Sequence, residues 1–195
     1  MSSTIETPLL PYPITICGLS ELCEHGEAGF THVVSILDPV WPDPQEFGGW
    51  GAHRRVLWRF DDVVRVANGY QAPARSDVQA ILALGAELKG QAAARVLIHC
   101  HAGVSRSTAT AVILMAQQNP GREAGIFAEL RRIRPRSWPN ALMLKLADDM
   151  LRRDGALMVE LYRHQRRIAD AYPEFAELLS RFGRAHEIAA LNRAR

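Results

Sequence analysis

Residues 95–107 read RVLIHCHAGVSRS, a short apolar run that ends at a cysteine and passes through a glycine-containing loop to an arginine. Five residues separate Cys100 from Arg106, and we call residues 100–106 the cysteine loop. A loop that leaves a buried strand and enters a helix can direct several backbone N–H groups at one point, where the helix N-terminus also favours negative charge. The same N–H groups and Arg106 favour the nucleophilic thiolate form of a cysteine. This stretch therefore predicts an anion-binding loop with a reactive thiol at its base.

The segments on both sides of this loop alternate between strand and helix patterns. Short apolar runs predict strands over residues 14–19, 31–37, 55–60 and 95–99. Apolar spacing and chain breakers predict helices over residues 76–89, 107–118, 122–134 and 140–153, with further helices in a tail broken at Pro173. The alternation predicts an α/β fold: a central, mostly parallel sheet of four to five strands, helices on both faces and a helical C-terminal extension. The cysteine loop would lie at the carboxyl end of a central strand, where such sheets bind ligands.

Composition sets limits on the class of protein. The 195 residues are 48% hydrophobic and 23% charged, which predicts one soluble globular domain with a sizeable core. A net charge of +2 is too small to indicate nucleic-acid binding. Residues 1–97 hold 7 basic and 11 acidic side chains, whereas residues 98–195 hold 16 and 10. A basic second half suits an anionic substrate, although arginines on exposed helix faces give the same count.

The cysteines and the N-terminus indicate where the protein works. Cys17, Cys23 and Cys100 are odd in number and no metal-ligand spacing joins them, which favours a reducing cytoplasm and a protein without a metal or cofactor. The N-terminal residues MSSTIETPLLPYP lack a basic flank and a continuous apolar stretch. No later segment approaches the roughly 20 apolar residues that span a membrane. We therefore expect neither export nor membrane insertion.

The motif HCHAGVSRS (residues 99–107) resembles the signature of the cysteine-based protein tyrosine phosphatases, and its AGVSRS part is similar to the dual-specificity subgroup. The resemblance implies a protein tyrosine phosphatase-like fold and a nucleophilic Cys100, with Arg106 holding two phosphoryl oxygens through its planar guanidinium group. It implies that Ser107 donates a hydrogen bond to the Cys100 sulfur and that His99 supports the loop from behind. The implied phosphate-binding residues are those whose backbone surrounds the anion: His101, Ala102, Gly103, Val104, Ser105 and Arg106.

The reaction needs a general acid from another segment, and two segments offer one. Trp41, Pro42 and Asp43 spell the WPD tripeptide of the tyrosine-specific branch, but they follow the second predicted strand. Asp61 and Asp62 follow the third, where the family's chain order puts the acid, and WRFDD resembles the WPFDD of the prenylated liver-regeneration phosphatases. We therefore choose Asp62 as general acid and base, keep Asp61 as its alternative, and interpret the WPD as a coincidence in a surface loop.

The segment after the third predicted helix adds to the resemblance. Residues 134–140, RPRSWPN, resemble the family's R-P-x-x-x-P-N segment, which packs beside the cysteine loop; a helix connection with Asn140 as N-cap would also explain them. The resemblance ends near Arg153. We therefore expect a phosphatase domain over residues 1–155 and a helical extension over residues 156–195, packed on the same domain.

The sequence thus predicts a cytoplasmic, metal-independent phosphatase that hydrolyses phosphotyrosine through a phosphocysteine intermediate, with phosphoserine and phosphothreonine as further substrates to test. The expected partner is a phosphorylated protein or a small phosphate ester. One alternative is a phosphatase of an inositol, lipid or other small phosphate. The variable loop positions His101, Ala102, Val104 and Ser105 weaken the lipid alternative, because similar lipid phosphatases place lysines there. A second alternative is a pseudophosphatase that binds phosphate without turnover.

Overall fold

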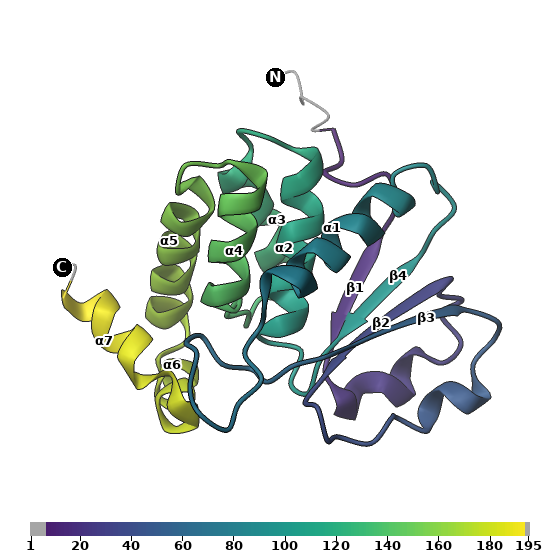
Figure 1. Ribbon diagram of the computed structural model, residues 1–195, viewed down its shortest axis with the longest axis horizontal. Coiled ribbons are helices and arrows are strands. Elements are labelled where there is room, and N and C mark those ends of the chain that lie inside the picture. The colour runs from purple at the N-terminus through teal and green to yellow at the C-terminus, as the bar shows by residue number, and fades with distance from the viewer. Residues whose placement is uncertain (1–6, 194–195) are drawn as a thin grey trace.

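A computed structural model describes residues 7–193 of the chain (Figure 1). Residues 1–6 and 194–195, which belong to the ends of the two expected domains, lie outside the described residues. Four strands form one sheet in the order β1-β4-β2-β3, and every neighbouring pair is parallel. They are β1 (Ile14–Cys17), β2 (His32–Leu37), β3 (Arg54–Arg59) and β4 (Val96–His99). The predicted parallel α/β sheet is confirmed, and β4, which leads into the cysteine loop, is one of its two central strands.

Helix α1 (Arg75–Leu88) lies between β3 and β4, and the other α-helices follow one another after β4. These are α2 (Arg106–Gln118), α3 (Glu123–Ile133), α4 (Ala141–Leu151), α5 (Ala156–Ala171), α6 (Pro173–Leu179) and α7 (Ala185–Arg193). Short helical turns complete the described chain: η1 (Leu19–His25), η2 (Glu46–Gly49) and η3 (Ser180–Arg184). Helix α1 begins one residue before the predicted Ser76, because the Asp77 carboxylate accepts from the Ala74 N–H at 2.7 Å and caps the helix there.

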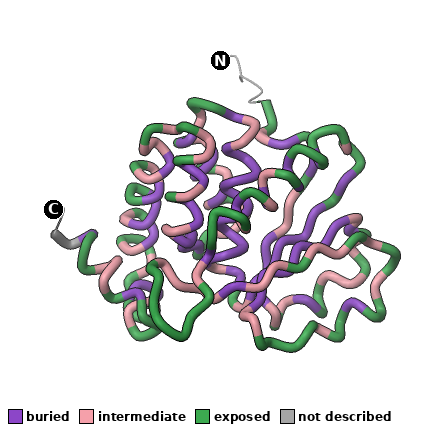
Figure 2. Tube along the Cα trace, viewed as in Figure 1, coloured by how far each residue is buried: buried purple, intermediate pink, exposed green. Residues whose placement is uncertain are grey.

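The two faces of the sheet are covered differently. Alternate strand residues such as Val34, Ile36, Val96 and Ile98 join the large core beneath α1 to α5, which Figure 1 shows stacked on one side of the strands. Leu97 and its neighbours on the opposite face join a smaller cluster formed with η1 and η2. Figure 2 shows the buried positions running along the strands and the inner faces of the helices. Both faces are therefore covered, as predicted, but by helices of very different length.

Helix α2 fixes the cysteine loop in the middle of the molecule. All of its residues from Arg106 to Ala116 are buried, so its N-terminus cannot move without disturbing the core. Because the strands are parallel, their carboxyl ends meet at one edge of the sheet, and the segments that follow β1, β2 and β3 surround the loop that follows β4. Within residues 7–193, no helix is long and apolar enough to cross a membrane.

Candidate active site

Surrounding segments hold the cysteine loop in place by donating hydrogen bonds to its backbone carbonyl groups. Five successive carbonyls accept hydrogen bonds from surrounding segments at 2.8 to 3.3 Å: His101 from the Leu19 N–H, Ala102 and Gly103 from the Arg134 guanidinium, Val104 from the Trp138 N–H, and Ser105 from the Asn140 N–H. A peptide carbonyl points away from the N–H of the next residue. The N–H groups of residues 102–106 therefore face the inside of the loop, where they can surround an anion.

Gly103 permits the close approach of this loop to β1. Its φ of +67° lies in the left-handed region, and a Cβ on it would lie 2.4 Å from the backbone carbon of Cys17. A side chain is thus excluded both by conformation and by space. The loop consequently rests directly on the end of β1, which fixes its height above the sheet.

Cys100 lies at the base of the loop. It is 2% exposed, and its Sγ lies 3.3 Å from the Oγ of Ser107, in the first turn of α2. A hydroxyl at this distance can donate a hydrogen bond to a thiolate. The structure thus brings the predicted nucleophile and its predicted supporting hydroxyl together.

One side of the Arg106 guanidinium group is held by acceptors from two neighbouring segments. Its Nη1 donates to Oδ1 of Asp38 at 2.7 Å and to the carbonyl of Phe60 at 2.6 Å. Its Nε is buried without a hydrogen-bond partner among the described residues. A buried N–H without a partner costs free energy, and a planar guanidinium binds phosphoryl oxygens through two parallel N–H bonds. The unpaired Nε therefore marks a position suited to an anion.

Asp38 is a site residue that the sequence analysis missed. It follows β2 directly, and besides Arg106 it approaches His101, whose Nε2 lies 3.6 Å from Oδ1. Burial, the largest influence, and the charge of Arg106 lower the pKa of His101, against the opposing effect of Asp38. An acidic residue at the carboxyl end of a predicted parallel strand was the available signal, because those ends converge.

Asp62 bonds directly to the cysteine loop. Its Oδ1 accepts from the Ser105 hydroxyl at 2.7 Å and from the Asn140 side-chain amide at 2.9 Å. Asp61 instead accepts from the backbone N–H of Gln71 at 2.7 Å, which closes the loop after β3. Of the two adjacent carboxylates, Asp62 is thus the one turned toward the site.

The WPD tripeptide lies at the rim of the site. The ring centroid of Trp41 is 4.5 Å from that of His101, while the Asp43 carboxylate pairs with Arg59 at the end of β3. Arg59 also donates to the backbone carbonyls of Asp38 and Trp41, so it ties this segment together. Trp41 of the tripeptide thus forms an aromatic wall beside His101. The Asp43 carboxylate holds the segment after β2 against Arg59.

Two of the predicted supporting residues are buried beneath or beside the loop. His99 shares a hydrogen bond of 2.6 Å with Ser35 of the adjacent β2, and burial lowers its pKa to about 4, so it is neutral at physiological pH.

Asn140 accepts from the Met143 N–H at 3.1 Å and so caps α4. Arg134 pairs with Glu21 through two bonds of 2.8 Å while it holds the loop carbonyls. Both interpretations of residues 134–140 are therefore confirmed.

Arg184 is a second residue that the sequence analysis missed. It comes from η3 in the C-terminal segment and donates to Asp62 Oδ1 at 2.6 Å. Burial raises the pKa of Asp62, but Arg184, Arg106 and the bonds from Asn140 and Ser105 outweigh it, and the net pKa lies below its usual value. Nothing in the tail's sequence pattern distinguishes this arginine from its neighbours.

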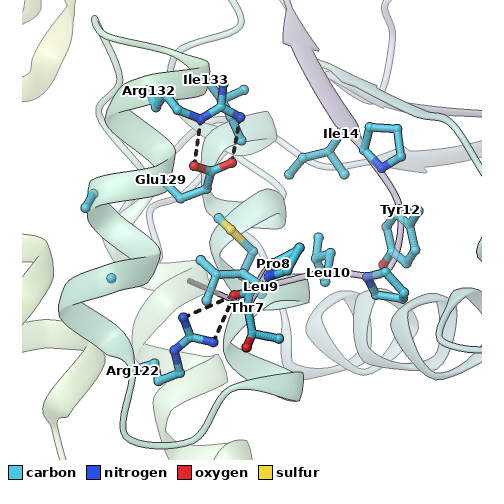
Figure 3. A pocket seen from close by; sticks show the side chains of 15 residues that line it. Thr7, Pro8, Leu9, Leu10, Tyr12, Ile14, Arg122, Glu129, Arg132 and Ile133 are labelled. Atoms are coloured by element: carbon cyan, nitrogen blue, oxygen red, sulfur yellow. Dashed lines mark hydrogen bonds and ion pairs between the residues drawn. The ribbon is translucent and has the colours of Figure 1, made fainter. Parts of the chain in front are cut away.

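A cavity of about 620 Å³ lies elsewhere, between the N-terminal segment and α3 (Figure 3). Its lining includes Ile14, at the amino end of β1, and no residue of the cysteine loop. It is therefore at the edge of the sheet opposite to the thiol. Among residues 7–193, no three His, Cys, Asp or Glu side chains are grouped so that they could hold a metal ion.

Solved structures are similar to this chain in fold. The human tyrosine phosphatase-like serine/threonine/tyrosine-interacting protein matches 73% of this chain and 93% of its own, with a TM-score of 0.54 and 19% identity. Human DUSP28 matches over 73% and 94%, with a TM-score of 0.54 and 16% identity. A structure of PTPMT1 in complex with PI(5)P matches over 75% and 94%, with a TM-score of 0.53 and 11% identity.

No protein-family model matches the sequence, and no curated protein matches it either. At identities of 11% to 19% these structural matches establish the fold and leave activity to be argued from the site itself. The chain therefore has the fold of the tyrosine and dual-specificity phosphatases, with a C-terminal helical segment in addition.

Proposed function

We propose that this protein is a cysteine-dependent phosphatase that hydrolyses phosphotyrosine in proteins. The observation that carries the proposal is the position of Arg106 at the end of a loop with inward N–H groups and a thiol at its base, with a buried Nε that has no hydrogen-bond partner within residues 7–193. These groups together suit a tetrahedral dianion above a nucleophile. We assign the phosphatase domain to residues 1–155 and the extension to residues 156–195, and we expect a reducing compartment such as the cytoplasm.

In the first step the Cys100 thiolate attacks phosphorus in line with the leaving oxygen. The S–P bond forms while the P–O bond breaks, and protonated Asp62 transfers its proton to the departing oxygen. Arg106 and the loop N–H groups bind the three non-bridging oxygens, over which negative charge is spread in the transition state.

In the second step water attacks the phosphocysteine. Ionised Asp62 accepts a proton from that water, the S–P bond breaks, and inorganic phosphate leaves. Ser107 stabilises the thiolate that departs, through the hydrogen bond for which its Oγ lies 3.3 Å from Sγ. Both steps use the same carboxylate, first as acid and then as base.

The rim of the site supports phosphotyrosine as the substrate group. Trp41 is 44% exposed and lies against His101 of the cysteine loop, where it can contact a flat aromatic ring that leads into the anion site. The loop carries no lysine, and Arg106 is its one arginine. A highly charged inositol phosphate would therefore meet few cations in the loop itself.

The test is release of phosphate from a phosphotyrosine peptide, a phosphoserine peptide and an inositol phosphate, measured with wild type, Cys100→Ser and Cys23→Ser. We expect wild type to prefer phosphotyrosine and Cys100→Ser to lose at least about a thousandfold in rate. Cys23 is an exposed thiol, and its replacement should leave the rate unchanged. Asp62→Ala should lower turnover while phosphopeptide binding stays nearly intact. Full activity of Cys100→Ser would refute the proposed nucleophile.

One observation favours a second candidate function, phosphate recognition without turnover. Asp62 must be protonated to act as an acid, yet Arg184 holds it as a carboxylate. A wild-type protein that binds the phosphotyrosine peptide but forms no phosphocysteine in a rapid-quench experiment would establish this function. A trapped phosphocysteine would exclude it.

A further inference from the structure

The C-terminal segment bends sharply where it reaches the candidate active site. Phe182 and Gly183 depart from helical geometry between α6 and α7, and Gly183 adopts a φ of +82°. Glycine accepts this left-handed conformation without steric cost. Figure 1 shows the bend beside the loop that follows β3. The bend places the next residue, Arg184, in the interior, where it is 7% exposed.

Arg184 connects three segments at this place. Its Nη2 donates to Asp62 Oδ1 at 2.6 Å and to the Ser105 hydroxyl at 2.9 Å. Its Nη1 donates to Oε2 of Glu187 at 3.1 Å, and the same oxygen accepts from the indole N–H of Trp138 at 3.3 Å. Arg184 is thus fixed from both sides, and its orientation toward Asp62 is built into the fold.

We propose that Arg184 is a positioning residue of the active site, which holds the Asp62 carboxylate against the cysteine loop through an ion pair from the C-terminal segment. This inference rests on the proposed function, because it assigns a role relative to the general acid. The extension, residues 156–195, would then supply a residue of the active site in addition to packing against the phosphatase domain.

The geometry of Asp62 shows what this positioning achieves. The bonds from Ser105, Asn140 and Arg184 all end on Oδ1, at 2.6 to 2.9 Å. Oδ2 is outside this set. One oxygen is therefore the anchor of the carboxyl group and the other is left to carry the proton toward a leaving oxygen. Arg184 supplies the charged member of the anchor.

The charge near Asp62 is also determined by several elements. Asp62 interacts electrostatically with Arg184 from η3, Arg106 from α2 and His101 from the cysteine loop. Glu187 from α7 acts indirectly, because it pairs with Arg184. Arg184 is the strongest of the influences that lower the pKa of Asp62. Removing its charge should therefore raise that pKa, so Asp62 would stay protonated to a higher pH.

The experiment compares the pH dependence of kcat in wild type and Arg184→Gln, with an alkyl phosphate or phosphotyrosine substrate whose leaving oxygen needs a proton. Loss of acid activity gives the falling side of this profile. We expect Arg184→Gln to move the falling side upward by about one pH unit, the lower end of the effect of a close opposite charge. Arg184→Lys, which keeps the charge, should move it less. Arg181→Gln removes an exposed arginine of the same segment that pairs with Glu177, and should not move it.

Glu187→Gln provides a variant with the opposite sign. It removes the carboxylate that competes with Asp62 for Arg184, so the falling side should move to lower pH. The Asp62 carboxyl can also be titrated directly by carbon-13 NMR, with its signal assigned by Asp62→Asn. An unchanged Asp62 titration in folded Arg184→Gln would overturn the inference. If wild type turns over no substrate, the proposed catalytic function fails, and the NMR titration still decides whether Arg184 controls Asp62.

Discussion

Arg106 and Asp38 form an ion pair of 2.7 Å at the carboxyl end of the sheet, although 68 positions separate them in the chain. The pair uses Nη1 of the arginine, and Nε has no hydrogen-bond partner in the part of the chain that the structure describes. Because a guanidinium group is planar, fixing one edge also fixes the direction of the other. Asp38 therefore fixes the orientation of the Arg106 edge that carries Nε, the edge suited to an anion.

Replacement of Asp38 should weaken substrate binding through Arg106. We expect Asp38→Ala to lower kcat/KM for a phosphotyrosine peptide by about 10- to 100-fold, since a hydrogen bond to a charged group contributes about 1.5 to 3 kcal/mol. Asp38→Asn keeps an acceptor oxygen and should lose less. Steady-state kinetics of the two variants provide the measurement, and equal, wild-type kcat/KM values in both would contradict the anchoring role.

Two glycines with the same positive φ allow a test of how tightly the cysteine loop is packed. Gly103 and Gly29 both have a φ of +67°, but a Cβ on Gly29 would meet nothing within 4 Å, whereas one on Gly103 would meet the Cys17 backbone. Gly29→Ala should cost about 1 to 2 kcal/mol of unfolding free energy, the conformational term alone. Gly103→Ala should cost more and abolish phosphate binding.

Urea unfolding and binding of vanadate, a phosphate analogue, measure the two effects separately. Because the cost of a side chain at positive φ applies to both variants, the additional loss in Gly103→Ala reports the contact with β1. Equal unfolding free energies and intact vanadate binding in Gly103→Ala would show that the loop can lift from β1 without loss.

Local sequence patterns predicted the parts of the fold that local physics determines. The apolar run before His99 and the buried stripe of α2 could be recognised because strands and helices have distinct periods. The motif also indicated Cys100 and Ser107, whose 3.3 Å separation follows from their positions on one loop and one helical turn. Residues that lie within a few positions of each other in the chain were therefore predictable.

The partners that escaped prediction are distant in sequence. Arg184 is 122 positions from Asp62, and it reaches the site only because Gly183 bends the chain and Glu187 holds the guanidinium from behind. No periodicity records such a contact, since an arginine in a polar tail has the same pattern when it is solvated. The choice between Asp61 and Asp62 likewise depends on which carboxylate accepts the hydrogen bond from the Gln71 backbone N–H. In the structure that carboxylate is Asp61.

Ser107 should affect the second chemical step more than the first. Its hydroxyl can stabilise the thiolate that leaves when phosphocysteine is hydrolysed. We expect Ser107→Ala to lower kcat about tenfold, from a hydrogen bond of about 1.5 kcal/mol, while kcat/KM changes little. Stopped-flow measurements with an aryl phosphate should then show a burst of phenol followed by slow turnover. Equal losses in kcat and kcat/KM, without a burst, would indicate that Ser107 acts earlier.

Buried neutral histidines should make the fold sensitive to mild acid. His99 and His164 are almost completely buried, and burial lowers the pKa of each from 6.5 to about 4. Between these values the unfolded chain binds a proton that the folded chain does not, so stability is full above pH 6.5 and is lost as the pH falls toward 4. Each histidine should contribute about 1.4 kcal/mol per pH unit within this window.

His164→Gln tests this through the slope of stability against pH, which is independent of any packing that the substitution also removes. The imidazole bonds to the hydroxyl and carbonyl of Ser137 at 3.1 Å, and glutamine can keep a polar contact there without titrating. Urea unfolding at several values between pH 5 and pH 6.5 avoids the range below about 4.5 in which Glu21 and Asp62 titrate in the unfolded chain. The variant should lose stability less steeply than wild type by about 1.4 kcal/mol per pH unit near pH 5. Parallel curves would mean that His164 takes up its proton in the folded protein, which would require Arg131, whose Nη1 lies 3.4 Å from Nδ1, to move away from the imidazole.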